Sequence, residues 1–284
     1  MGATCLPAQV QGWQHAVGQV APQAPNARIV VLDLSTGHLL AASNLADAAR
    51  TLAAPGSTLK PLILYGLLTG GHWNPQTRIA CNRDTVIEGR KLACSHPPAP
   101  PFDAREALTW SCNTYFAAVA RTLQPGTLGE LLRTSGVLGS TGLFTPEASA
   151  YFREPRTTAE EQLSFLGLAG IRITPLELAA AYSRLAVDMA SHPDSGATRT
   201  VMAGLRDSAT FGMASDAGDG EIAVAGKTGT AEGATTSQTH GWFVGLAPAQ
   251  HPRIVLVVYL PAGRGADAAR IAGKILAHAP AEQR

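Results

Sequence analysis

The chain has 284 residues, of which 45% are apolar and 15% are charged, and its formal net charge is +1 at pH 7. This composition is typical of a compact globular protein with one large domain or two small ones. Such a balanced charge gives no reason to expect nucleic acid or an anionic membrane as a partner. No apolar run reaches membrane-spanning length, and residues 1–20 lack the basic flank and long apolar stretch of a signal peptide. We therefore expect no transmembrane segment, and the compartment stays open at this point.

The first part of the chain predicts a helix followed by a pair of strands. Residues 9–20 are expected to form a helix that covers a sheet. Residues 27–34 (ARIVVLDL) are rich in β-branched and aliphatic residues, which is typical of a buried strand. The turn residues 35–37 (STG) then lead into a second strand at 38–42.

The middle of the chain has mostly helical patterns. Residues 60–68 are almost wholly apolar, which fits a helix buried on all sides. Because proline is tolerated only in the first turn, Pro61 requires that helix to begin close to Ser57. Residues 174–185 carry the clearest signal: a threonine N-cap, a proline at the first helical position and a glutamate three residues after the cap. Further helices are predicted at residues 103–123 and 157–168.

Three more strands are predicted near the other end of the chain, at residues 221–231, 240–247 and 253–260. Short loops join them, as in an antiparallel meander, and residues 265–279 have helical spacing. The predicted fold class is therefore α+β. It has an antiparallel sheet of about five strands from both chain ends, flanked by helices, with an inserted, mainly helical subdomain.

We expect a single domain over residues 1–284. Residues 1–48 and 215–284 are predicted to form the sheet with its covering helices, and residues 49–214 the inserted helical part. A cleft is expected where the two parts meet. Three short strings that can line this cleft stand in one order along the chain: Ser57-Thr-Leu-Lys60, Ser111-Cys-Asn113 and Lys227-Thr-Gly-Thr230. The chain has only four lysines, so the abundance of lysine does not explain why two of them fall in these strings.

Ser57 and Lys60 are spaced so that they share one face of a helix. A serine hydroxyl is a poor nucleophile until a base takes its proton, and a neutral lysine amine can be that base if burial lowers its pKa. The alternative is that Ser57 only caps the helix and Lys60 is a solvated side chain. Against this, Lys60 precedes an apolar stretch, where an unpaired lysine is costly.

Ser111 and Asn113 are alternate residues of a predicted loop after a helix, so both can face the cleft. The Ser111 hydroxyl could pass a proton between lysines and a leaving amine. The Asn113 amide offers a donor and an acceptor that can hold a peptide backbone. Helix capping is the simpler explanation for this string taken alone.

The third string lies on a predicted strand, where Thr228 and Thr230 share one face and Lys227 points to the other. A hydroxyl and an ammonium together suit a ligand that carries a carboxylate. Gly229 allows a substrate backbone to approach closely. The backbone N–H groups of Ser57 and Thr230 could stabilise an oxyanion, and an ordinary turn-rich strand is the alternative.

The four cysteines suggest no metal site, and the eight histidines are scattered, so neither a metal nor a cofactor is expected. Cys81 and Cys94 flank a stretch that could form a hairpin-like excursion. They could form a disulfide in an oxidising compartment or stay as free thiols. Cys112 is expected to be a packed small side chain rather than a nucleophile.

These motifs and their flanks resemble the transpeptidase domain of penicillin-binding proteins, a family of serine penicillin-recognising enzymes with a β-lactamase/transpeptidase-like fold. The resemblance covers roughly residues 27–262. The stretch 31–42 is similar to the family's first hairpin, and the pair Cys81 and Cys94 is similar to one that some members carry. The other segments that carry the resemblance are 54–61, 107–116, 167–182 and 240–248.

The resemblance implies a role for each motif residue. Ser57 would be the acylated nucleophile, Lys60 its base and Ser111 the proton shuttle. The substrate would be a peptidoglycan stem peptide ending in D-Ala-D-Ala, and a β-lactam antibiotic would acylate Ser57 as a mimic. The residues implied in substrate binding are Asn113, Lys227, Thr228, Gly229 and Thr230.

The leading hypothesis is therefore a D,D-transpeptidase or D,D-carboxypeptidase that acts in the periplasm or another extracytoplasmic space. A β-lactamase is a second possibility, although the sequence assigns no glutamate to fast deacylation. The positions of Glu154, Glu160 and Glu161 relative to the cleft are not predicted. A non-catalytic β-lactam- or peptidoglycan-binding sensor domain belongs to a different class. A related peptide cyclase is a further alternative.

Overall fold

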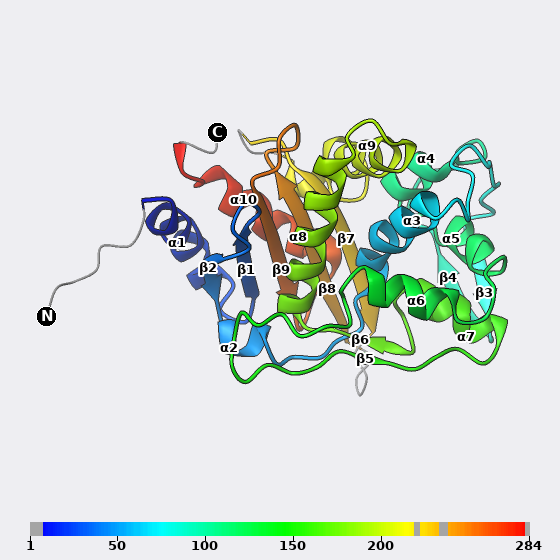
Figure 1. Ribbon diagram of the computed structural model, residues 1–284, viewed down its shortest axis with the longest axis horizontal. Coiled ribbons are helices and arrows are strands. Elements are labelled where there is room, and N and C mark those ends of the chain that lie inside the picture. Colours follow the sequence, from blue (N-terminus) through cyan, green and yellow to red (C-terminus); the bar gives the residue numbers. More distant parts are fainter. Residues whose placement is uncertain (1–7, 219–221, 233–237, 282–284) are drawn as a thin grey trace, which may run out of the picture.

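The computed structural model describes residues 8–218, 222–232 and 238–281. Its centre is a five-stranded antiparallel sheet in the order β2-β1-β9-β8-β7. Figure 1 shows strands from the start of the chain lying beside strands from its end, as predicted. The strand bounds are β1 Arg28–Asp33, β2 Leu39–Ser43, β7 Ala225–Glu232, β8 Thr239–Ala247 and β9 Ile254–Leu260. The predicted start of the third strand, residue 221, lies outside the described residues.

Alternate side chains of the strands enter two separate cores. Ile29, Val31 and Val258 face the helices α1 (Ala8–Val20) and α10 (Gly265–Ala277). Val30 and Val257 face the opposite side, which α8 (Pro175–Ser191) covers. In Figure 1, α8 lies across the strands, with α10 on the other side of the sheet. Because successive side chains of a strand point to opposite faces of the sheet, each strand contributes side chains to both cores.

The middle of the chain is mainly helical, and parts of it pack beside β7. Its long buried helix is α3 (Lys60–Thr69), which carries Pro61 in its first turn as predicted. A short 3-10 turn, Gly56–Leu59, leads directly into α3. The other helices described here are α2 Leu45–Ala48, α4 Ala104–Thr109, α5 Asn113–Ala120, α6 Thr127–Thr134, α7 Thr158–Phe165 and α9 Gly196–Thr210. Two short 3-10 turns are Ala21–Gln23 and Ser215–Ala217. The division of the chain into sheet and helical parts stays a prediction, because α8 comes from the middle of the chain yet packs on the sheet.

Two small sheets complete the fold. The hairpin-like excursion predicted between Cys81 and Cys94 is present as β3 (Asp84–Ile87) paired with β4 (Arg90–Ala93). Both cysteines are free thiols, as is Cys112. A second pair joins β5 Tyr151–Phe152 to β6 Ile171–Arg172.

The prediction of one helix over residues 103–123 was wrong. The segment forms two helices, α4 and α5, which are separated at Ser111, where φ is +54°. A left-handed residue cannot continue a right-handed helix, so the chain must break there. The side chain of Cys112 then caps the new helix by accepting the N–H of Tyr115.

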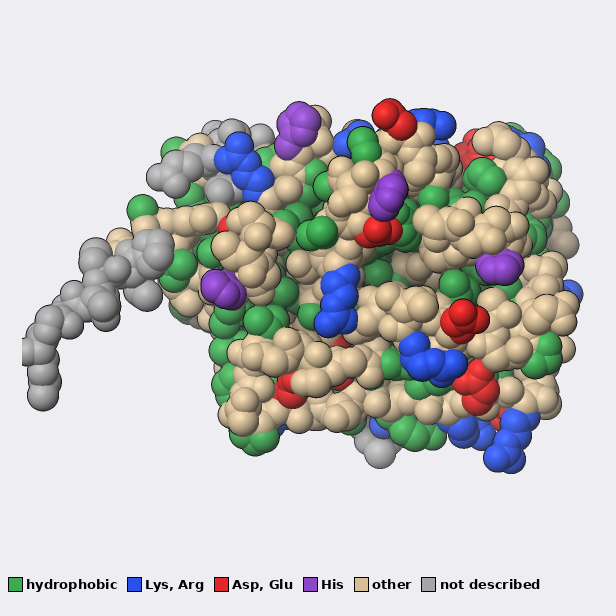
Figure 2. Space-filling model, in the orientation of Figure 1, with side chains coloured by type: hydrophobic (Ala, Val, Ile, Leu, Met, Phe, Trp, Pro, Cys, Tyr) green, Lys and Arg blue, Asp and Glu red, His purple; other side chains and the backbone are tan. Residues whose placement is uncertain are grey.

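Basic and acidic side chains are interspersed on the face shown in Figure 2, in keeping with the nearly neutral net charge. Among the described residues, no helix combines the length and apolar character needed to cross a bilayer.

Candidate active site

All three motifs meet at a pocket of about 290 Å³ beside β7. Ser57, Ser111 and Asn113 line it from the helical part. Thr228, Gly229 and Thr230 line it from the sheet, so the predicted cleft is confirmed in position. Lys60 and Lys227 lie behind this wall and are fully buried.

The 3-10 turn that carries Ser57 is in direct backbone contact with β7. A Cβ atom added at Gly229 would lie 2.6 Å from the carbonyl oxygen of Pro55, which only glycine avoids. Gly56, with φ of +56°, approaches Thr230 so closely that an added Cβ would lie 2.9 Å from its carbonyl oxygen. These glycines therefore bring the backbones of Ser57 and Thr230 to the same end of the pocket.

Lys60 connects α3 to the second motif. Its ammonium group donates to the carbonyl oxygen of Ser111 at 2.9 Å and to Oδ1 of Asn113 at 2.8 Å. It also lies 3.4 Å from the Ser111 hydroxyl and 5.0 Å from the centre of the Phe116 ring. Burial lowers the pKa of Lys60 from 10.5 to about 8. The alternative of a solvated Lys60 side chain is therefore wrong.

Lys227 reaches the same hydroxyl from the sheet. Its Nζ atom donates to Oγ of Ser111 at 2.9 Å and to the carbonyl oxygen of Thr228 at 2.9 Å. Burial and then the nearby charge of Lys60 hold the pKa of Lys227 well below its usual range. The Ser111 hydroxyl thus lies between two buried amines, a site where keeping both amines charged is unfavourable.

The two threonines of the third motif point away from Lys227, as the strand alternation predicts. The Thr228 hydroxyl donates to the carbonyl oxygen of Met213 at 3.1 Å. The Thr230 hydroxyl accepts the N–H of Gly265, the first residue of α10, at 2.9 Å. Both residues still line the pocket along the edge of β7.

Among the described residues, no hydrogen bond joins the Ser57 hydroxyl to Lys60, which was predicted to take its proton. Lys60 is bonded to the second motif, and no hydrogen bond of the Ser57 hydroxyl occurs among the described residues. Ser57 faces the pocket and is partly exposed. Its activation by Lys60 stays a prediction.

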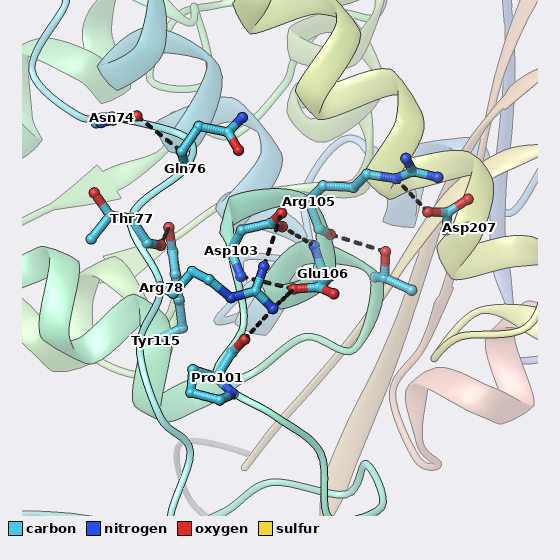
Figure 3. Close-up of polar contacts among 11 residues, drawn as sticks. Asn74, Gln76, Thr77, Arg78, Pro101, Asp103, Arg105, Glu106, Tyr115 and Asp207 are labelled. Atoms are coloured by element: carbon cyan, nitrogen blue, oxygen red, sulfur yellow. Dashed lines mark hydrogen bonds and ion pairs between the residues drawn. The ribbon is translucent and has the colours of Figure 1, made fainter.

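The helix before Ser111 is held firmly at its start, as Figure 3 shows. Asp103 and Glu106 form a capping box at the N-terminus of α4. Arg78 pairs with Glu106 at 3.0 Å, and Arg105 pairs with Asp207 of α9 at 2.7 Å. These contacts fix the helix whose end places Ser111 between the lysines.

Sequence reasoning missed one wall of the pocket, the segment from Arg90 to Ser95 that includes β4. Arg90 forms an ion pair with Glu232 of β7 at 3.0 Å, which joins this segment to the sheet. Among the described residues, Glu232 is the one carboxylate that lines the pocket. The glutamates weighed from the sequence, 154, 160 and 161, do not line it. No local pattern marks this wall, because the fold alone brings it to the site.

An α+β fold with two serines and two lysines clustered at the edge of its antiparallel sheet is the signature of the serine penicillin-recognising proteins. The sequence matches the family model described as penicillin binding protein transpeptidase domain over residues 27–279. The chain belongs to this family.

Individual relatives are more distant. A peptidoglycan D,D-transpeptidase, PbpA of Mycolicibacterium smegmatis, is 25% identical over 254 residues, covering 74% of this chain and 50% of the relative. The chain thus spans about half the length of that curated relative.

Solved structures share the fold. Pseudomonas aeruginosa PBP2 in complex with WCK 5153 superposes with a TM-score of 0.79 at 21% identity, covering 96% of this chain and 76% of the other. The transpeptidase domain of Burkholderia pseudomallei penicillin-binding protein 3 gives 0.77 at 22% identity, with coverages of 95% and 90%. A protein described as a peptidoglycan glycosyltransferase from Burkholderia ambifaria gives 0.78 at 22% identity, with coverages of 94% and 92%.

Proposed function

We propose that this chain is a serine acyltransferase that acts on peptidoglycan stem peptides through an acyl-enzyme at Ser57. The activity would be that of a D,D-transpeptidase or D,D-carboxypeptidase. One observation carries the proposal: two buried lysines hold the Ser111 hydroxyl in the wall of the pocket that Ser57 faces. Membership of the family supports the same conclusion.

Acylation begins when Ser57 Oγ attacks the carbonyl carbon of the donor peptide. A neutral Lys60 amine has two N–H groups and one lone pair. The contacts to Ser111 O and Asn113 Oδ1 use both N–H groups, and the Ser111 hydroxyl lies 3.4 Å from the same nitrogen. In the proposed step, the lone pair of this nitrogen accepts the Ser57 proton. The pKa of about 8 makes a neutral amine available near neutral pH.

The negative charge that develops on the carbonyl oxygen needs donors at the sheet edge. We assign this role to the backbone N–H groups of Ser57 and Thr230, which the glycine contacts bring to one end of the pocket. Each such donor typically contributes about 3 kcal/mol to stabilising the transition state.

The leaving group is the terminal D-Ala, whose nitrogen must gain a proton as the peptide bond breaks. The Ser111 hydroxyl, bonded to Lys227, can supply that proton and regain one from Lys60. Lys227, Thr228 and Thr230 provide the positive charge and hydroxyls for the terminal carboxylate. An amine then resolves the acyl-enzyme in transpeptidation, and water resolves it in carboxypeptidation.

The β-lactam ring carries a strained amide beside a carboxylate, so penicillin is proposed to acylate Ser57 in the same way. A β-lactamase needs a base that activates water for rapid deacylation. Among the described residues, Glu232 is the one carboxylate on the pocket wall, and it is ion-paired at the surface. The peptidoglycan substrate places the proposed activity outside the cytoplasmic membrane.

A non-catalytic sensor domain remains the candidate from another class. Burying two lysines costs several kcal/mol per ion, and binding alone does not require an amine on each side of one hydroxyl. The arrangement is useful when a proton has to move, which favours an enzyme.

The test is intact-mass spectrometry after treatment with fluorescent penicillin. Wild type should gain the mass of one penicillin, and Ser57→Ala should gain none. The control is Ser95→Ala, which removes another exposed serine of the pocket wall and should label like wild type. Labelling of Ser57→Ala would refute the nucleophile. Release of D-Ala from an acyl-D-Ala-D-Ala peptide separates an enzyme from a sensor, and rapid nitrocefin turnover would instead establish a β-lactamase.

A further inference from the structure

Three cysteines and one histidine from separate segments meet behind the second motif. The ligand atoms of Cys81, Cys94, His96 and Cys112 all lie within 4.8 Å of one another. The Sγ atoms of Cys94 and Cys112 are 3.9 Å apart. Cys94, His96 and Cys112 are each less than 5% exposed, so this is an interior cluster rather than a surface coincidence.

One ring nitrogen of His96 has no hydrogen-bond partner among the described residues. Nδ1 of His96 lies 2.7 Å from the carbonyl oxygen of Pro97. A carbonyl can only accept, so Nδ1 carries the hydrogen and Nε2 is left as the basic nitrogen. Nε2 is buried and has no hydrogen-bond partner among the described residues. Leaving such an atom unsatisfied costs about 1–3 kcal/mol, whereas metal ligation would use it fully.

The sulfur atoms receive backbone N–H groups, as metal-bound thiolates do. Asn113 N–H donates to Cys94 Sγ at 3.2 Å, and Tyr115 N–H donates to Cys112 Sγ at 3.4 Å. The backbone N–H of Arg83 points to Cys81 Sγ at 3.4 Å. Such donors favour the thiolate form and orient it, which is the usual role of groups around a metal's ligands.

We propose that Cys81, Cys94, His96 and Cys112 bind one zinc ion. Three thiolates and an imidazole form a standard tetrahedral set for structural zinc, with bonds of about 2.3 Å to sulfur and 2.0 Å to nitrogen. Ligands at these bond lengths lie about 3.5–3.8 Å apart, so the cluster needs only a small contraction. Binding converts three thiols to zinc thiolates and releases their protons to solvent. The sequence spacing gave no hint of this site, since only the fold assembles it.

The zinc centre would position the second motif of the proposed active site. Cys112 lies between Ser111 and Asn113 in the chain, and Cys94 Sγ accepts the Asn113 N–H. The Asn113 side chain also donates to the carbonyl oxygen of Ala93 at 3.1 Å. The ion would therefore hold both the left-handed Ser111 turn and the pocket wall that precedes Cys94. This part of the inference rests on the proposed function.

The same ion would also fasten the excursion that carries three of its ligands. At its base, the excursion is closed by a backbone bridge between Ile79 and Phe102. Arg78 adds a hydrogen bond to the carbonyl oxygen of Pro101 at 2.6 Å, drawn in Figure 3. Zinc would join Cys81, Cys94 and His96 of this segment to Cys112, the N-cap residue of α5. A disulfide between Cys81 and Cys94 would consume two ligands, so the two states exclude each other.

The first test measures metal content and ligand type directly. Reduced protein is stripped with a chelator, reloaded with zinc, desalted and analysed by elemental mass spectrometry. We expect one zinc per chain in wild type and in Cys5→Ser, which removes the cysteine outside the cluster. Cys94→Ser and His96→Ala should lose it. Cobalt loading of wild type should give thiolate-to-cobalt charge-transfer bands and tetrahedral ligand-field bands, which do not depend on any variant folding. Wild type that stays free of zinc and cobalt, or that holds a Cys81–Cys94 disulfide as isolated, overturns the proposal.

The second test separates the metal from the proposed function. Stripped wild type should react with fluorescent penicillin about 10- to 100-fold more slowly than zinc-loaded protein, and added zinc should restore the rate. Ser57→Ala should bind zinc normally yet never label. Zinc-loaded wild type that does not label would refute the proposed function and leave the metal site standing. Equal labelling rates with and without bound zinc would refute the positioning role.

Discussion

The pH dependence of acylation tests the role of Lys60 most directly. Burial lowers the pKa of this amine from 10.5 to about 8. At pH 7, a pKa of about 8 leaves roughly a tenth of the molecules with a neutral amine, against roughly 0.03% for an ordinary lysine. Burial therefore raises the population able to accept the Ser57 proton about 300-fold.

The expected profile follows from that population. The rate of labelling by fluorescent penicillin, measured under single-turnover conditions, should rise about tenfold from pH 6 to pH 7 and level off above pH 8. Lys60→Ala should slow labelling about 10²- to 10⁴-fold and flatten the profile. Lys91→Ala, which removes an exposed lysine of the pocket wall, should keep the wild-type profile. A flat wild-type profile from pH 6 to pH 9, or one that still rises at pH 10, would refute Lys60 as the base.

Three further predictions use the same geometry. The pKa of Lys60 is lower in the folded than in the unfolded protein, so between pH 8 and 10.5 the unfolded state binds more protons. The free energy of unfolding of wild type should therefore rise with pH relative to that of Lys60→Met, by up to about 1.4 kcal/mol per pH unit in denaturant unfolding. If the difference in unfolding free energy between wild type and Lys60→Met fell as pH rose, Lys60 would not be buried as a neutral amine. Gly229→Ala would place Cβ 2.6 Å from the Pro55 oxygen, so it should lower stability by about 1–3 kcal/mol in thermal unfolding and slow labelling, whereas Gly196→Ala, which meets open space, should do neither. Ser111→Ala removes the hydroxyl between the lysines and should slow labelling about 100-fold with little loss of stability; an unchanged rate would rule out the proton relay.

The strands and the best-capped helix followed from local patterns. The aliphatic run that became β1 and the segments that became β8 and β9 are buried in the sheet's two cores, and their strand character can be recognised from neighbouring residues alone. Thr174 and Glu177 form the capping box predicted for α8, because a cap needs only neighbouring residues. The order of the motifs likewise identified the pocket.

What failed depends on contacts between distant residues. Nothing in the sequence around Ser111 demands a left-handed backbone, since serine has little preference for it. That conformation accompanies hydrogen bonds to Lys60 and Lys227, which lie far away along the chain. The cysteine–histidine cluster escaped notice for the same reason, because its ligands come from three segments with no regular spacing.

The left-handed turn and the cysteine–histidine cluster meet at residues 111–113, because Cys112 follows Ser111 directly. A left-handed serine and two buried amines each cost free energy, and such costs are retained where surrounding contacts over-determine the structure. On one side, Lys60 and Lys227 hold the Ser111 hydroxyl. On the other, Cys94 and the proposed zinc hold the backbone at Asn113. Because both sets of contacts act on one short turn, loss of the metal should be felt first in the lysine–serine geometry.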